Sequence, residues 1–142
     1  MSLRTFLLAI GAATLAFPLC ARAELPTITV RVTHPGVDTG TVEVSLFNSA
    51  DTFMKKPFLQ FSGHLDEDGV YTATFAAVPQ GEYAVVVVHD ENDNGTLDRG
   101  FLGLGGESYA FSNGARPWFG WPDFADAAFE VDQSVQLDIA LD

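Results

Sequence analysis

The sequence predicts an all-β protein, an antiparallel β-sandwich of immunoglobulin-like or prealbumin-like architecture with one long ordered loop. Three observations lead to this fold class. Short runs rich in Val, Thr and Phe alternate between apolar and polar residues, which is the period-two pattern of half-buried strands. Turn residues separate these runs at close intervals, and no segment keeps a helical period over three turns. Residues 90–126 lack the alternation, and this segment is the expected loop.

The first four predicted strands show the alternation most clearly. Strands at residues 27–33 and 41–47 each place apolar side chains on one face, and these are Ile28, Val30, Val32, Val42, Val44 and Leu46. Residues 59–65 and 70–75 flank the turn sequence Asp66-Glu67-Asp68-Gly69. We expect these two strands to form a hairpin, because Gly late in a short connection is typical of hairpin turns.

Residues 82–89 are apolar at both odd and even positions, which predicts a central strand that is covered on both faces. The last strands are expected at residues 127–131 and 135–141. The expected loop at residues 90–126, which follows the central strand, is aromatic, with Phe101, Tyr109, Phe111, Trp118, Phe119, Trp121 and Phe124. A structureless loop of this length is rare in a compact domain. We therefore expect it to fold back over the outer face of the central strand.

The first 23 residues have the pattern of a secretory signal peptide. Arg4 precedes an apolar run at residues 6–19, and Ala21-Arg22-Ala23 places small residues before a cleavage point. A lipid anchor on Cys20 is the alternative, but Leu19 stands where such a cut needs a small residue. Residues 24–142 then form a single domain, expected in the periplasm or outside the cell.

The excess of acidic residues limits the kinds of molecule that the protein can bind. The 142 residues include 7 Lys and Arg against 19 Asp and Glu, so the formal net charge is −12. Loss of residues 1–23 removes Arg4, Arg22 and no acidic residue, which makes the charge −14. Such an excess of acid argues against binding to nucleic acid or to an anionic membrane surface. The single Cys excludes an intramolecular disulfide.

The loop opens on a calcium-type sequence, Asp90-Glu91-Asn92-Asp93-Asn94-Gly95-Thr96-Leu97-Asp98. Oxygen-bearing side chains stand at relative positions 1, 3, 5 and 9, and Gly stands at position 6, as in the first part of an EF-hand loop. The expected Ca²⁺ ligands are Asp90, Asn92, Asn94, the Thr96 carbonyl and Asp98, the last directly or through water. Mg²⁺ suits the loop less well, because it keeps most of its water ligands.

The match to an EF-hand is partial. Position 12 is Phe101 instead of a bidentate Glu, and a strand replaces the leading helix. Glu107 is the nearest later acid and the candidate for the missing ligand. The alternative is a plain Asp/Asn/Gly turn in which Asp90 and Asn92 cap their own backbone.

The three histidines, His34, His64 and His89, are far apart in the sequence. A sandwich that gathers them could bind zinc or copper. The competing expectation is that His34 and His64 lie near strand ends and that His89 forms a hydrogen bond beside the calcium-type loop.

Enzyme motifs are absent from the sequence: it has no G-x-S-x-G elbow, no phosphate-binding Gly loop and no H-E-x-x-H. No catalytic residue is assigned. The leading hypothesis is an exported, non-catalytic module that binds an unidentified protein or glycan. One alternative is a periplasmic hydrolase of sugars or esters with Glu107, Asp123 and Asp126 as acids. Another is a carbohydrate-binding module that uses Trp118 and Trp121, two side chains that could equally pack inward.

Several strings also resemble a known family. They are Leu46-Phe47-Asn48-Ser49-Ala50, Val78-Pro79-Gln80-Gly81-Glu82-Tyr83-Ala84, the specific run from His89 to Asp98, and scattered residues from Gly103 to Phe129. Together they resemble the secreted bacterial proteins grouped as domain of unknown function 2141. The resemblance implies an exported sandwich of transthyretin-like or carboxypeptidase-regulatory-like shape and supplies no activity. Family members often carry Pro-Lys-Glu where this chain has Gly105-Gly106-Glu107.

Overall fold

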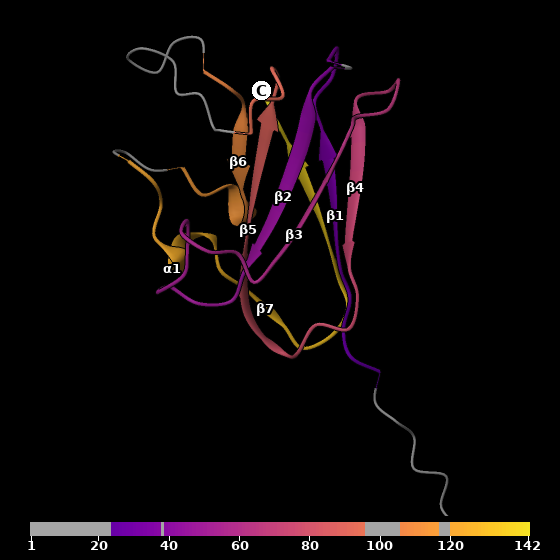
Figure 1. Ribbon diagram of the computed structural model, residues 1–142. Helices are drawn as coiled ribbons and strands as arrows, with labels where there is room; N and C mark the ends of the chain where they lie inside the picture. Colours follow the sequence, from indigo (N-terminus) through magenta and orange to yellow (C-terminus); the bar gives the residue numbers. More distant parts are fainter. Residues whose placement is uncertain (1–23, 38, 96–105, 117–119) are drawn as a thin grey trace, which may run out of the picture.

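The fold consists of two β-sheets in a computed structural model that describes residues 24–37, 39–95, 106–116 and 120–142 (Figure 1). The smaller sheet has the order β4-β1-β8, with β1 at Ile28–Thr33, β4 at Val70–Phe75 and β8 at Val135–Ala140. The larger sheet has the order β3-β2-β5-β6, with β2 at Thr41–Phe47, β3 at Leu59–Gly63, β5 at Gly81–Asp90 and β6 at Tyr109–Phe111. Strand β7, Phe129–Val131, pairs with the start of β5.

The all-β sandwich predicted from the alternation is confirmed, and the predicted strands exist with small changes at their ends. Two pairings differ from expectation. The hairpin prediction is wrong, because β3 pairs with β2 and β4 pairs with β1 in the other sheet. The turn between them carries the chain across the sandwich, and its Asp66 carboxylate accepts the N–H groups of Asp68 and Val70. Strand β8 runs parallel to β1, so the sandwich is not purely antiparallel.

The inner core lies between the two sheets. The six inward side chains expected on the first two strands are all fully buried. They pack with Phe75 of β4, with Ile139 of β8 and with Tyr83, Val85 and Val87 of β5. Burial of each such side chain stabilises the fold by about 1.5–3 kcal/mol, so this layer dominates stability.

A second apolar layer covers the outer face of β5. Ala84 and Val86 of β5 pack there against Phe53, Phe111 and Phe124. The segment after β5 therefore folds back over the strand, as its aromatic content predicts. It is also more regular than expected, since it contains β6, the 3₁₀ turn η1 at Ser112–Gly114 and the helix α1 at Phe124–Ala127. None of the helices in the described residues is long and apolar enough to cross a lipid bilayer.

Candidate functional site

The end of β5 presents two different groups to the two faces of its sheet. Alternation along the strand turns His89 toward the inner core and Asp90 toward the outer face. His89 is completely buried, whereas Asp90 is half-exposed. The calcium-type sequence therefore begins at the last residue of a rigid central strand.

Glu107 lies beside Asp90 because of strand register. In the β5–β6 ladder Val86 faces Phe111 and Val88 faces Tyr109. Continuing this register by two residues puts Glu107 opposite Asp90, and the bond from the His89 N–H to the Ser108 carbonyl maintains the pairing there. A side-chain hydrogen bond joins the Asp90 and Glu107 carboxyl groups. Glu107 is only 8% exposed, and its Oε1 is buried from solvent.

The first turn of the loop closes on the Asp90 carboxylate. Its two oxygens accept the N–H groups of Asn94, at 3.1 Å, and Gly95, at 2.7 Å. Partial removal from water raises the pKa of Asp90. The N–H bonds from Gly95 and Asn94, the Glu107 side chain and the N–H of Asp93 lower it by more, so the pKa lies below its ordinary value of 3.8. Asp90 is thus held in its charged form.

Two further contacts fix the shape of this turn. The Asn92 Oδ1 accepts the Asn94 N–H at 3.0 Å, and the Thr41 hydroxyl of β2 donates to Asp93 Oδ1 at 2.6 Å. Gly95 has φ 75°, the left-handed conformation that its place in the motif predicts. The expected ligands Thr96 and Asp98 lie outside the described residues.

The hydrogen bonds of the plain-turn interpretation are therefore present, and they are compatible with metal binding. A carboxylate oxygen has two lone pairs, so one that accepts an N–H can still bind a cation. Carboxylate and amide oxygens are the donors that Ca²⁺ prefers. Within the described ranges, which omit Asp98, no group of three or more His, Cys, Asp or Glu is placed to hold a metal ion.

All three histidines gather around the turn at residues 39–41, which enters β2. His34 follows β1 and approaches His89 with an Nδ1–Nδ1 distance of 3.0 Å. His89 Nε2 lies 2.7 Å from the Thr39 carbonyl, and His64 Nδ1 lies 2.8 Å from the Gly40 carbonyl. His34 and His64 stand just after strands, as one of the two expectations held. His64 and His89 each contact a backbone carbonyl through a ring nitrogen, and the Nδ1 atoms of His34 and His89 contact each other.

The hydrogen bonds fix the protons of the buried pair. A carbonyl can only accept, so His89 Nε2 donates to Thr39. The Nδ1 of a neutral His89 is then an acceptor, and His34 Nδ1 must donate to it. Burial lowers the pKa of His34, and the neighbouring His89 lowers it further, while Glu91 and Asp142 act in the opposite direction. No sequence signal predicts this pair, because it depends on how the two sheets pack.

The acids of the hydrolase alternative lie in two places. Asp123 and Asp126 form a capping box at the start of α1, where the Asp123 N–H donates to Asp126 Oδ2 at 3.2 Å. Helix α1 lies beside the lower part of β5, whereas Glu107 sits at the opposite end of that strand (Figure 1). These three acids therefore do not form one cluster.

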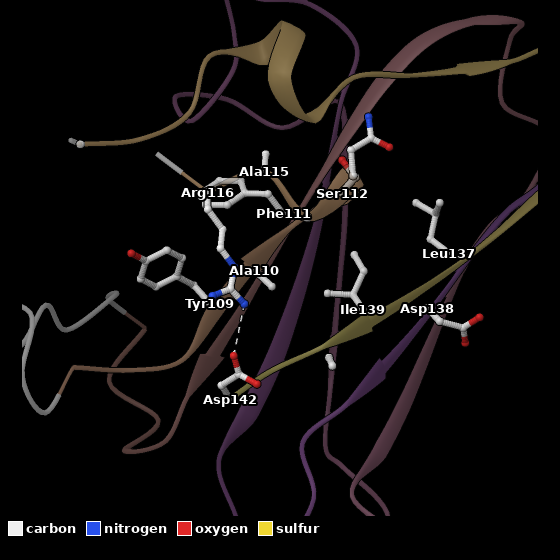
Figure 2. A pocket seen from close by; sticks show the side chains of 14 residues that line it. Tyr109, Ala110, Phe111, Ser112, Ala115, Arg116, Leu137, Asp138, Ile139 and Asp142 are labelled. Atoms are coloured by element: carbon white, nitrogen blue, oxygen red, sulfur yellow. Dashed lines mark hydrogen bonds and ion pairs between the residues drawn. The ribbon is translucent and has the colours of Figure 1, made fainter. Parts of the chain in front are cut away.

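Of the described aromatic residues of the loop, Phe111 packs inward and Trp121 and Phe124 are half-buried, whereas Tyr109 is exposed. Phe101 and Phe119 lie outside the described residues. Trp121 is half-buried and meets the rings of Tyr109 and Phe111 edge-on, at centroid distances of 5.1 and 5.8 Å. Trp118 lies outside the described residues. Beside this cluster a groove of about 600 Å³ runs between β6 and β8 (Figure 2). The ion pair of Arg116 and Asp142, at 3.3 Å, spans one end of it.

Two packed sheets with an acidic turn at the end of the central strand define the class, a β-sandwich domain with a candidate cation site. The chain belongs to the family described as "Uncharacterized protein conserved in bacteria (DUF2141)", whose model matches residues 30–138. The predicted family resemblance is thus confirmed. No curated protein and no solved structure matches the chain.

Proposed function

We propose that the protein is an exported, non-catalytic β-sandwich module that binds Ca²⁺ at the outer end of β5 and uses the ordered surface to bind a protein or glycan. The observation that carries the proposal is the contact between Asp90 and Glu107. Two carboxyl groups in contact need a proton or a cation between them, because two adjacent negative charges repel. The N–H groups of Asn94 and Gly95 hold Asp90 in its charged form, so its carboxylate is an oxygen donor that a cation can use.

The donor set supports calcium over other cations. Asp90, Asn92 and Glu107 offer oxygen donors from both sides of the β5–β6 ladder, and Asn94, the Thr96 carbonyl and Asp98 would complete a set of six. Six to eight oxygens suit Ca²⁺, whereas Mg²⁺ keeps most of its water. Free calcium is also high outside the cytoplasm, where the N-terminal sequence directs the chain.

Calcium at this position would act as a structural cross-link between two segments of the chain. It would join the end of β5 to Glu107, the residue two positions before β6, across the segment at residues 96–105. It would also neutralise part of the acidic charge that accumulates there. No step of chemical conversion follows from this arrangement, and we assign none.

The experiment is thermal unfolding of the purified protein in EDTA, in millimolar Ca²⁺ and in millimolar Mg²⁺. Binding to the folded state alone stabilises it by RT ln(1 + [L]/Kd), about 2.7 kcal/mol at a hundred times Kd. We expect a clear rise in Tm with Ca²⁺, a smaller one with Mg²⁺, and none in an Asp90→Ala, Asp98→Ala variant. Asp132→Asn, an exposed acid in the β7–β8 turn, is the matched control and should respond like the wild type.

An unchanged Tm in the wild type at millimolar Ca²⁺ would refute the metal site. Export is tested separately by mass spectrometry of protein expressed with its native N-terminus. The proposal expects a chain that begins at Glu24, and a mass that includes residues 1–23 would contradict it.

A further inference from the structure

The open edge of the inner core at strand β3 carries exposed apolar side chains. Phe58, Leu59 and Phe61 are 41%, 38% and 45% exposed, and they make up most of the exposed large apolar residues in the described part of the chain. The Phe58 ring lies 6.2 Å from Tyr83, and the Phe61 ring lies 5.0 Å from Phe75. These side chains therefore form the rim of the inner core between β3 and β4, which the described part of the chain leaves uncovered.

The backbone of β3 is available for pairing at the same place. Strand β3 is at the end of the sheet order, and its partner there is β2. Edge strands are commonly protected by charge, by Pro or by being very short. The five residues of β3 contain no charge and no Pro. Of the other edges, β6 has three residues and β8 carries Asp138, which pairs with Arg31 at 3.9 Å. The remaining edge, β4, also lacks charge and Pro, but none of its six residues is a large exposed apolar side chain.

Charges of opposite sign stand at the two ends of this edge. Lys55 and Lys56, the two lysines of the chain, precede β3, and the acidic turn Asp66-Glu67-Asp68 follows it. All five residues are exposed. If two β3 strands pair antiparallel about a twofold axis, the start of each strand meets the end of the other. The lysines of one copy then approach the acidic turn of its partner on both sides of the axis.

We infer that a second copy of this chain covers the rim, through antiparallel pairing of β3 with β3 about a twofold axis. Such pairing satisfies the edge hydrogen bonds, buries the three apolar side chains of each copy and brings four clusters of charge into two attractive pairs. The inference does not depend on the calcium site, which lies on β5. A different acidic protein could also meet the lysines, and the experiment separates that case.

The test is sedimentation velocity on the protein, expressed with its native N-terminus, from about 1 to 100 μM. The wild type should show a monomer–dimer equilibrium. Reversal of either charged cluster, as Lys55→Glu/Lys56→Glu or as Glu67→Lys/Asp68→Lys, should weaken the homodimer by about tenfold or more, because like charges then meet at both ends. Asp66 is left unchanged, since its carboxylate holds the turn.

The decisive step is to mix the two reversed variants. Each charged end then meets its opposite again, so a heterodimer of near wild-type affinity should form. Tyr109→Thr alters an exposed aromatic on the β6 edge and should leave dimerisation unchanged. A wild type that stays monomeric at 100 μM, reversed variants that dimerise normally, or a mixture that does not restore the dimer would each overturn the inference. Circular dichroism establishes that every variant is folded.

Discussion

Both faces of β5 are covered, but by different kinds of structure. The last residue on each face also carries a different chemical group. The inner face packs against a second sheet and ends at His89. Both ring nitrogens of His89 have hydrogen-bond partners, the Thr39 carbonyl and His34 Nδ1. The outer face packs against aromatic side chains such as Phe53, Phe111 and Phe124 and ends at Asp90, which contacts a second carboxyl group. One strand therefore ends in a hydrogen-bonded pair of histidines on one face and in a pair of carboxyl groups on the other.

The candidate site lies on the outer face for an electrostatic reason. A group between two sheets must be neutral and hydrogen-bonded, because the desolvation of a charge there is expensive. A group at the rim of the outer layer keeps access to solvent and to ions. The same alternation that buries His89 exposes Asp90.

The largest expected effect tests whether the outer layer is a true core. Phe111 is 4% exposed and packs against Phe53, Tyr109 and Trp121. Phe111→Ala should lower the free energy of unfolding by about 3–5 kcal/mol, as in an inner core. Tyr109→Ala, which removes a 46%-exposed ring from the same cluster, should cost about 1 kcal/mol. Urea unfolding measures both, and equal small losses would show that the outer layer is only a loose cover.

The next effect concerns Gly40, in the turn that lies against both His89 and Asp90. Gly40 has φ 79°, and a Cβ there would lie 2.4 Å from the Asp90 carbonyl oxygen and 3.0 Å from His89 Nε2. Gly40→Ala should therefore cost about 2–3 kcal/mol, from backbone strain and from displacement of both groups.

Gly36→Ala is the matched control, because Gly36 has φ 82° and open space around the added Cβ. It should cost only the strain, about 1 kcal/mol. The two variants are compared by chemical unfolding. Equal losses would mean that the close approach of the turn to β5 contributes nothing.

The sequence predicted the layers better than the pairings. Alternation is a local property, so it located the strands and the buried side chains such as Val30 and Val44. Pairing depends on distant segments, so the crossing of β3 to β4 between sheets was missed. Strand β6 was missed because three residues are too few to show a period. The sequence marks Glu107 only as the next acid after Asp98. The β5–β6 register supplies the physical reason for its position, while its role as a ligand stays a prediction.

The smallest expected effects are two losses of stability on acidification, one for each face of β5 at its C-terminal end. The pKa of His34 lies below its ordinary 6.5 in the fold, so the unfolded chain binds more protons once the pH drops under that value. The associated stability is complete above about pH 6.5 and is lost as the pH falls through the folded pKa. His34→Gln should flatten this part of the curve in EDTA. A wild-type slope that survives in the variant would assign the loss to other groups.

The pKa of Asp90 is likewise lowered, from 3.8, so its contribution persists to lower pH. It is present above about pH 3.8 and is lost as the pH falls through the folded pKa. Asp90→Asn should remove this second step and leave the first unchanged. The free energy of unfolding measured from pH 2.5 to 8 separates the two faces of the strand, and a single shared step would contradict their independence.

The most direct test of the cation site is the calcium-dependent stability of Glu107→Gln beside the wild type. In EDTA the variant should be as stable as the wild type or more so, because the Gln amide can donate to Asp90 and no second carboxyl group then lies beside it. In millimolar Ca²⁺ the order should reverse, with the wild type stabilised and the variant gaining less by about 1–2 kcal/mol, the size of a lost charged contact. A variant that gains as much from Ca²⁺ as the wild type would show that Glu107 is no part of a calcium site.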